Sequence, residues 1–365
     1  MPWTAIDMTS RRAFLAGMFA SSLTPIPTWA DAGSPAFLSA ARLPDGAYVL
    51  CGLATNGGMV FQLPLPARGH AAAAHPKRPE VVAFARRPGN FAMVIDCARG
   101  AVTTELHAPV GFHFYGHGVF SRDARRLYTT ENQYDAARGM IGVWDAANGY
   151  KRIGHFESGG IGPHEISRLP ETDTLIVANG GIETHPEAGR AKLNLATMAP
   201  NLSYISETGE MLEQAALAPD LHQNSIRHID VNAAGAVAMG MQWQGDMTEV
   251  PPLVAVHRRG GAVQLLDAGT ELHRDVDGYI GSIAFDPTAE IIAATCPRGG
   301  RVLLFDATSG RPRAPVEAID ACGVARHGRG LIVTSGTGAV GALHGTDLTP
   351  QSRHNLAFDN HLVRL

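Results

Sequence analysis

The sequence predicts an all-β protein, a seven-bladed β-propeller, and three observations lead to this fold class. Strand patterns recur along the chain in similar units, helical periodicity is weak, and each end of the chain supplies part of one unit. A β-sandwich would also contain many short strands, but it would not repeat one unit seven times in series. We therefore expect residues 33–365 to form a single closed propeller domain.

The repeating unit is a hairpin in which a turn rich in Gly, Asn, Asp, Ser or Thr separates two strands. The seven copies, of which the last is the weakest, lie at residues 48–65, 91–107, 141–156, 202–217, 253–266, 302–316 and 340–356. Two further apolar runs lie between consecutive hairpins, as at residues 118–120 and 127–130. Each unit thus has four short strands, which is the composition of a propeller blade.

The two ends of the chain predict how the ring closes. Residues 361–365 form one strand pattern without a partner of its own, and residues 37–65 supply three strands before the first complete blade at His70. One C-terminal strand plus three N-terminal strands gives a seventh blade and removes the open sheet edges. We expect deletion of residues 361–365 to open or unfold the ring.

Residues 1–32 are predicted to be an export signal and not part of the fold. Arg11 and Arg12 precede a mostly apolar run at residues 16–29, and small residues at positions 28, 30 and 32 suit a signal peptidase. The pattern resembles a twin-arginine signal peptide, so we expect a periplasmic protein without membrane insertion after cleavage. A membrane anchor is the alternative, but the run is shorter than the roughly 20 residues of a span, and Pro25 and Pro27 interrupt it.

Composition excludes several other functions for the mature chain. Charged residues make up 18% of the sequence and the formal net charge is −4, so no basic face for nucleic acid or anionic lipid is expected. The four cysteines show no metal or haem motif, and one disulfide remains open as an alternative. The sequence contains no nucleophile elbow and no phosphate-binding loop. We expect a monomer, and catalysis is left undecided.

Histidines recur at one position of the predicted blades. When the first strands of blades 1 to 7 are aligned, the column reads His70, His117, His164, His228, Ser282, Gly323 and His361. Five histidines in seven places is far above expectation in a chain with 16 histidines among 365 residues. First strands line the central channel of a propeller, so these five imidazoles should converge on its axis.

Converging neutral imidazoles are ligands for iron, copper and zinc. We therefore predict a transition metal ion, iron or copper before zinc, held by the five histidines, some of them as hydrogen-bonding supports. Blades 5 and 6 lack a histidine, so we expect an open coordination sector there. The alternative is a water-filled channel without metal, in which mutual repulsion lowers the pKa values of the imidazoles.

A further group of residues is expected close to the metal, as supports for the ligands or as a substrate wall. They precede first strands, follow second strands, or lie in an insertion at residues 179–200: His113, Tyr115, Glu131, His185, His222, Trp243 and Cys322. Ordinary turn or surface roles are the alternative for each of them.

Several longer strings carry a family resemblance. These are FHFYGHG at residues 112–118, YTTEN at 128–132, GIGPHE at 160–165, ANGGIETHP at 178–186 and SIRH at 225–228. They resemble the domain-of-unknown-function 1513 family over nearly the whole mature chain. The resemblance implies an exported propeller encoded beside imelysin-type periplasmic iron-uptake proteins and a di-haem peroxidase-like protein, hence a role in iron or copper handling. The family brings no established activity.

Three functions are therefore open. The first is a metal-binding component of periplasmic iron uptake that works with imelysin-type proteins. The second is a metal-dependent oxidoreductase that uses the open sector at blades 5 and 6 for an exogenous ligand. The third is a metal-free propeller that serves as a docking scaffold.

Overall fold

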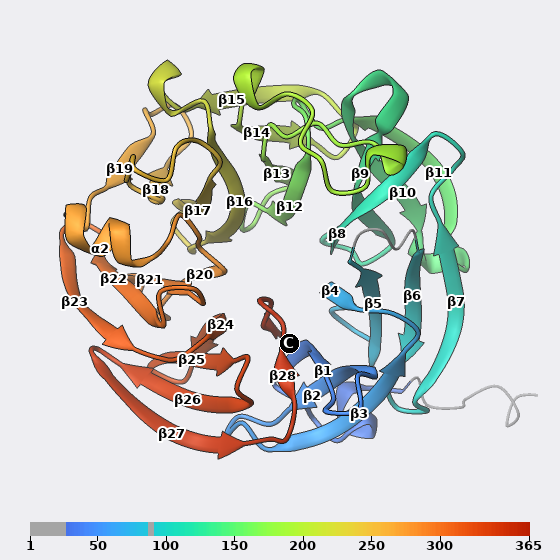
Figure 1. Cartoon of the computed structure of the whole chain (residues 1–365). Coiled ribbons are helices and arrows are strands. Elements are labelled where there is room, and N and C mark those ends of the chain that lie inside the picture. Colours follow the sequence, from blue (N-terminus) through green and yellow to red (C-terminus); the bar gives the residue numbers. More distant parts are fainter. Residues whose placement is uncertain (1–26, 87–90) are drawn as a thin grey trace, which may run out of the picture.

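The computed structural model describes residues 27–86 and 91–365, which form a ring of seven antiparallel sheets around a central channel (Figure 1). The predicted seven-bladed propeller is confirmed. Most of the predicted export signal, residues 1–26, lies outside the described residues. In each of blades 1 to 6 the chain runs from an inner strand beside the channel to an outer strand at the rim.

Blades 1 to 3 follow each other without a crossover. Blade 1 contains β4 (Gly69–Ala74), β5 (Glu80–Ala85), β6 (Phe91–Asp96) and β7 (Ala101–His107). Blade 2 contains β8 (Phe112–Phe120), β9 (Arg126–Gln133), β10 (Arg138–Asp145) and β11 (Lys151–Glu157). Blade 3 contains β12 (Pro163–Arg168), β13 (Thr174–Asn179), β14 (Asn201–Ser206) and β15 (Met211–Ala216).

Blades 4 to 6 continue the same meander. Blade 4 contains β16 (Asn224–Val231), β17 (Val237–Trp243), β18 (Val254–His257) and β19 (Gln264–Leu266). Blade 5 contains β20 (Ser282–Phe285), β21 (Ile291–Cys296), β22 (Arg301–Asp306) and β23 (Pro312–Glu317). Blade 6 contains β24 (Ala321–His327), β25 (Gly330–Ser335), β26 (Ala339–His344) and β27 (Asp347–Arg353).

Blade 7 joins both ends of the chain, as predicted. Its outer strands are β1 (Phe37–Arg42), β2 (Tyr48–Leu53) and β3 (Met59–Leu65), and its inner strand is split into β28 (Ala357–Phe358) and β29 (Val363–Arg364). Both C-terminal segments pair antiparallel with β1. The Leu365 amide donates to the Ala36 carbonyl at 3.0 Å, and Leu362 is buried in the same core cluster as Phe37.

Burial across a blade explains the strand sequences. Every residue of β25 and nearly every residue of β21 is buried, because neighbouring blades cover both faces of these middle strands. The outermost strands are much more exposed, and β11 alternates exposed with half-buried positions. Prolines occur on three of these outermost strands, whose free edges pair with no further strand: Pro64 in β3, Pro312 and Pro315 in β23, and Pro350 in β27.

Helices play a small part in the described residues. They are η1 (Trp29–Ala32), η2 (Tyr134–Ala136), η3 (Ala146–Asn148), η4 (Pro186–Ala188), η5 (Leu195–Thr197), η6 (Pro219–Leu221) and α2 (Thr270–Asp275). The predicted insertion in blade 3 carries η4 and η5. Within residues 27–86 and 91–365, no helix has the length and hydropathy that a bilayer span requires.

Two further observations concern the end of the predicted export signal and the cysteines. The η1 turn packs on the ring, with the Trp29 indole N–H donating to the His75 carbonyl at 3.2 Å, although the predicted signal extends to residue 32. All four cysteines are buried and unpaired, so the disulfide considered from the sequence is absent from this structure.

Candidate metal centre

The column histidines lie where the inner strands break their pairing with the second strands. The register shifts at or beside His70 in β4, His117 in β8, His164 in β12 and His228 in β16. His361 lies in the gap between β28 and β29. Such irregularities re-aim a side chain out of the normal two-residue alternation. The sequence placed the histidines at strand starts; in β8 and β16 they lie inside the strand, and the local break turns them to the axis.

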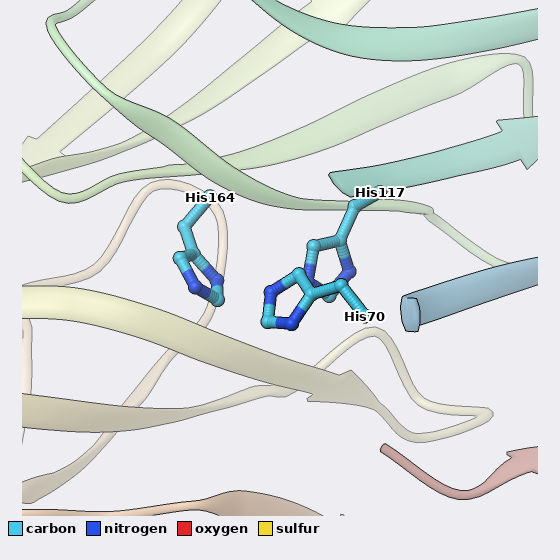
Figure 2. A group of neighbouring side chains, drawn as sticks. All are labelled: His70, His117 and His164. Carbon is cyan, nitrogen blue, oxygen red and sulfur yellow. The ribbon is translucent and has the colours of Figure 1, made fainter. Parts of the chain in front are cut away.

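The five imidazoles form one cluster in the channel. Figure 2 shows the rings of His70, His117 and His164 gathered together, and their ring centroids are 4.9 to 5.3 Å apart. His361 lies 4.5 Å from both His70 and His117, and His228 lies 5.0 Å from His164. All five are buried, with exposed fractions of 9% or less.

The sequence predicts an open sector without histidine at blades 5 and 6, but the histidines on either side of this sector lie close together. The rings of His228 in blade 4 and His361 in blade 7 are 5.1 Å apart, so no gap separates the imidazoles at blades 5 and 6. Inner-strand residues of those blades, including Ser282 and Arg326, line a cavity beside the cluster. Long imidazoles on the flanking strands therefore bridge the sector that lacks histidine.

Close packing around His70 depends on Gly116. This residue has a φ of +102°, and a Cβ atom at its position would lie 2.5 Å from Cδ2 of His70. Glycine is the residue that tolerates both the left-handed backbone and the contact. Gly116 thus lets the irregular segment of β8 approach the ring of His70.

Unpaired ring nitrogens distinguish this cluster from an ordinary buried histidine core. Nδ1 of His70 and Nε2 of His117, His228 and His361 are buried and have no protein hydrogen-bond partner, while Nδ1 of His228 has an ion-pair contact with the Glu165 carboxylate at 3.3 Å. Buried polar atoms without partners are rare and point to a bound ion or water. His164 differs, because its Nδ1 lies 3.1 Å from the Arg227 carbonyl and must donate to it, which leaves the lone pair on Nε2.

Two sets of side chains have the spacing of metal ligands. The potential ligand atoms of His70, His117 and His164 lie within 4.8 Å of one another, and so do those of His117, Glu165 and His361. Two ligands of one ion at about 2.1 Å each are at most about 4.2 Å apart, so small side-chain movements suffice for binding. The donors fit a transition metal ion, which imidazole nitrogen binds well.

The imidazoles are neutral at neutral pH, which is the state that binds metal. Burial holds the pKa values of His70, His117 and His164 well below the usual 6.5. Burial, together with nearby positive charges, lowers the pKa of His228 to about 3 and that of His361 to about 4. Lowered pKa values were expected for the metal-free alternative, but they equally prepare the cluster for an ion.

A cavity of about 390 Å³ extends along the channel from the cluster. Residues that follow the column position in all seven inner strands line it, and it reaches His117 and His361. Its polar side chains include Glu165, Asp230 and Arg326. Burial raises the pKa of Glu165 to about 7 and that of Asp230 to about 6.

Glu165 and Asp230 were missed from the sequence, although each closely follows a column histidine. Glu165 is the neighbour of His164, and in a regular strand adjacent side chains point to opposite faces. The register shift between Pro163 and Glu165 removes that restriction. The Glu165 Oε2 atom accordingly lies 3.3 Å from His228 Nδ1.

Several residues expected beside the metal have structural partners elsewhere. Glu131 lies in β9 and not in a loop, and its carboxylate points toward the rim, where Arg152 binds both oxygens at 2.6 and 2.7 Å. Trp243 is in the core of blade 4 and donates to the Asp246 carbonyl at 2.8 Å. Neither side chain supports the histidine cluster, because strand pairing continues past the predicted second-strand end.

His113 and Tyr115 lie within β8. Tyr115 contacts the insertion of blade 3 directly, and His113 is linked to it through Tyr134, whose ring lies 5.1 Å from that of His185. The Tyr115 hydroxyl lies 3.2 Å from the Thr184 hydroxyl, and His113 stacks on Tyr134 with ring centroids 5.9 Å apart. His185 extends from the insertion to Asp135, at 3.2 Å. These residues position a loop and were expected to support the metal.

The last two residues expected beside the metal are His222, which follows a short helical turn, and Cys322, which lies next to the column position. The ring nitrogen Nδ1 of His222 lies 3.0 Å from the Pro219 carbonyl, so this side chain caps its own turn. Cys322 lies in the irregular part of β24, next to the column position, and its thiol faces Asp320 at 3.7 Å. Burial raises the pKa of Cys322, so the neutral thiol is the stable form.

Comparisons with known proteins identify the fold and the family. No curated protein matches the chain. Among solved structures, Kuenenia stuttgartiensis hydrazine synthase is similar at 14% identity and a TM-score of 0.58, covering 92% of this chain and 98% of that one. The β-propeller domain of Myceliophteria thermophila Cps50 (Swd1) has 12% identity and a TM-score of 0.57, covering 85% and 91%. At such identities the likeness concerns the fold alone. The model of the family described as "Protein of unknown function (DUF1513)" matches residues 63–365, and the chain belongs to this family.

Proposed function

We propose that this protein binds a transition metal ion, iron or copper before zinc, at the five channel histidines. One observation carries the proposal: four of five buried imidazoles have ring nitrogens without a protein partner, and they face each other across the channel. A buried unsatisfied nitrogen costs about 1–3 kcal/mol, and a bound ion would remove that cost. His164 supports the same reading, since its hydrogen bond to Arg227 orients the ring as in known metal sites.

We further propose that the protein acts in the periplasm after twin-arginine export, in iron or copper handling with imelysin-type iron-uptake proteins. The Arg11-Arg12 motif supports export, and the part on iron or copper handling rests on what the family resemblance of the sequence implies.

Elemental analysis of the purified full-length chain tests metal binding. We expect about one equivalent of metal in the natural protein and much less in a His117→Ala, His164→Ala variant. This variant lacks two of the three ligands in the set of His70, His117 and His164. The control is His107→Ala, His155→Ala, which also removes two histidines, both exposed on outer strands. Equal metal content in all three folded proteins would contradict the proposal and leave a water-filled channel or a scaffold.

One observation favours the oxidoreductase as a second candidate. The cavity of about 390 Å³ reaches His117 and His361, so a small exogenous ligand has a route to the cluster. Azide added to the copper-loaded protein tests this access. A new absorption band is expected if the route is used, whereas an unchanged spectrum would leave metal handling as the function.

A further inference from the structure

Glu165 gives the cluster a second set of ligands with a different environment. His70, His117 and His164 form an all-imidazole set, whereas His117, Glu165 and His361 combine two imidazoles with a carboxylate. All three members of the second set line the axial cavity, while of the first set only His117 does so. The two sets therefore share one side chain and differ in access.

We propose that His117, Glu165 and His361 form a cavity-facing coordination site for a divalent transition metal ion, through which ions reach and leave the histidine cluster. This inference rests on the proposed metal binding and adds a route and a further ligand. His117 and His361 have exposed fractions of 4% and 6%, and Nε2 of each lacks a protein partner. Each side chain thus offers a buried nitrogen ligand beside the cavity.

Charge pairing singles out Glu165 among the acidic groups of this cavity. Arg326 lies 2.7 Å from Asp230 and compensates its charge. Glu165 instead faces an imidazole, with Oε2 at 3.3 Å from His228 Nδ1, and it accepts a hydrogen bond from the Ile229 amide at 3.2 Å. A dication held by imidazoles alone keeps its full charge in a buried place, and a carboxylate ligand offsets part of it.

His117 belongs to both sets, so an ion could pass from one set to the other without leaving it. His361 lies 4.5 Å from His70 and from His117, centroid to centroid, so the two sets are in contact. His117 can keep hold of an ion while Glu165 and His361 are exchanged for His70 and His164. The cavity-facing set thus handles exchange with solvent, and the all-imidazole set handles retention.

Exchange kinetics with Co²⁺ test the role of Glu165 in the full-length protein. Glu165→Gln keeps an oxygen that accepts from the Ile229 amide but removes the charge. We expect the variant to bind Co²⁺ and to release it to a chelator about tenfold or more slowly than the natural protein, with uptake slowed as well. The matched control is Glu213→Gln, because Glu213 has similar exposure, 23% against 22%, and also faces a histidine, His257.

The outcomes separate the two proposals. No Co²⁺ binding by the natural protein would overturn the metal-binding function itself. Binding with equal exchange rates in the natural protein, Glu165→Gln and Glu213→Gln would overturn only the role of Glu165.

A second experiment does not depend on rates. His70→Ala removes the all-imidazole set, so it should still bind Co²⁺ at the cavity-facing set, with faster exchange and a changed d–d spectrum. Adding Glu165→Gln to His70→Ala should abolish this binding. Equal binding by the single and the double variant would contradict the proposed site.

Discussion

At the scale of single residues, the buried imidazoles make the stability of the metal-free protein depend on pH. Histidines of the unfolded chain take up protons below about pH 6.5. In the folded protein the pKa of His361 is about 4 and that of His228 about 3, so these rings stay neutral. Between about pH 6.5 and 4 the unfolded state binds more protons, and the free energy of unfolding falls as the pH falls.

Two carboxylates have the opposite effect on stability, but the free energy of unfolding still falls as the pH falls. The pKa values of Glu165 and Asp230 are raised to about 7 and about 6, so the folded state takes up their protons first and gains stability on acidification. Five histidines with lowered pKa values have a larger effect on the free energy of unfolding than two carboxylates with raised pKa values. We expect the metal-free protein to lose more than about 2 kcal/mol between pH 7 and pH 5 in urea unfolding. Constant or rising stability over this interval would contradict the arrangement.

Gly116 offers a second test at this scale. Gly116→Ala should lower the free energy of unfolding by about 1–3 kcal/mol and also reduce metal content, because its Cβ would lie 2.5 Å from the His70 ring. Gly149→Ala is the matched control, since Gly149 has a φ of +75° and no atom within 4 Å of the added Cβ. The control should lose stability from backbone strain alone and keep its metal. If both variants retain metal equally, the Gly116 contact does not position His70.

Residue roles were predictable from the sequence only where a pattern repeats. The five column histidines could be found because the same residue returns in successive blades. Glu165 has no counterpart in the column, and its direction depends on a break in strand pairing that its own sequence does not indicate. Glu131 was expected in a loop because it follows the predicted second strand of blade 2, yet Arg152 and strand pairing keep it inside the blade.

At the scale of elements, the split C-terminal strand connects closure of the ring with the cluster. Deletion of residues 361–365 removes β29, the buried Leu362 and His361 together. We expect the free energy of unfolding to fall by about 3 kcal/mol or more, with loss of a single cooperative transition in thermal unfolding.

A point variant separates the two contributions of this strand. His361→Ala keeps the pairing of β28 and β29 with β1, so its stability should change by less than about 2 kcal/mol while metal exchange is altered. A deletion variant as stable as His361→Ala would mean that residues 361–365 do not close the ring.

At the scale of the whole molecule, the fold was predictable in nearly full detail. Seven similar hairpins and the incomplete units at the ends define both the number of blades and the closing blade. The shape of the channel was less accessible to prediction. The sequence suggested an arc with an open sector, but imidazoles are long enough to meet across a narrow axis, as His228 and His361 do.

The similar solved structures have 14% and 12% identity to this chain, so they inform its fold alone. A propeller scaffold is compatible with many channel linings, so function has to be argued from the side chains at the axis. In this chain those side chains are the five histidines and Glu165. The insertion of blade 3, tied to Tyr115 and Asp135, is the longest connection between two strands of one blade in residues 27–86 and 91–365.

The position of His361 between β28 and β29 has a consequence for biosynthesis. The ribosome makes His361 after the other four histidines, and its ring contacts theirs only once the closing strand is in place. A nascent or truncated chain therefore lacks a complete cluster. A metal ion that enters through His117, Glu165 and His361 would do so only after the whole ring has been translated and closed.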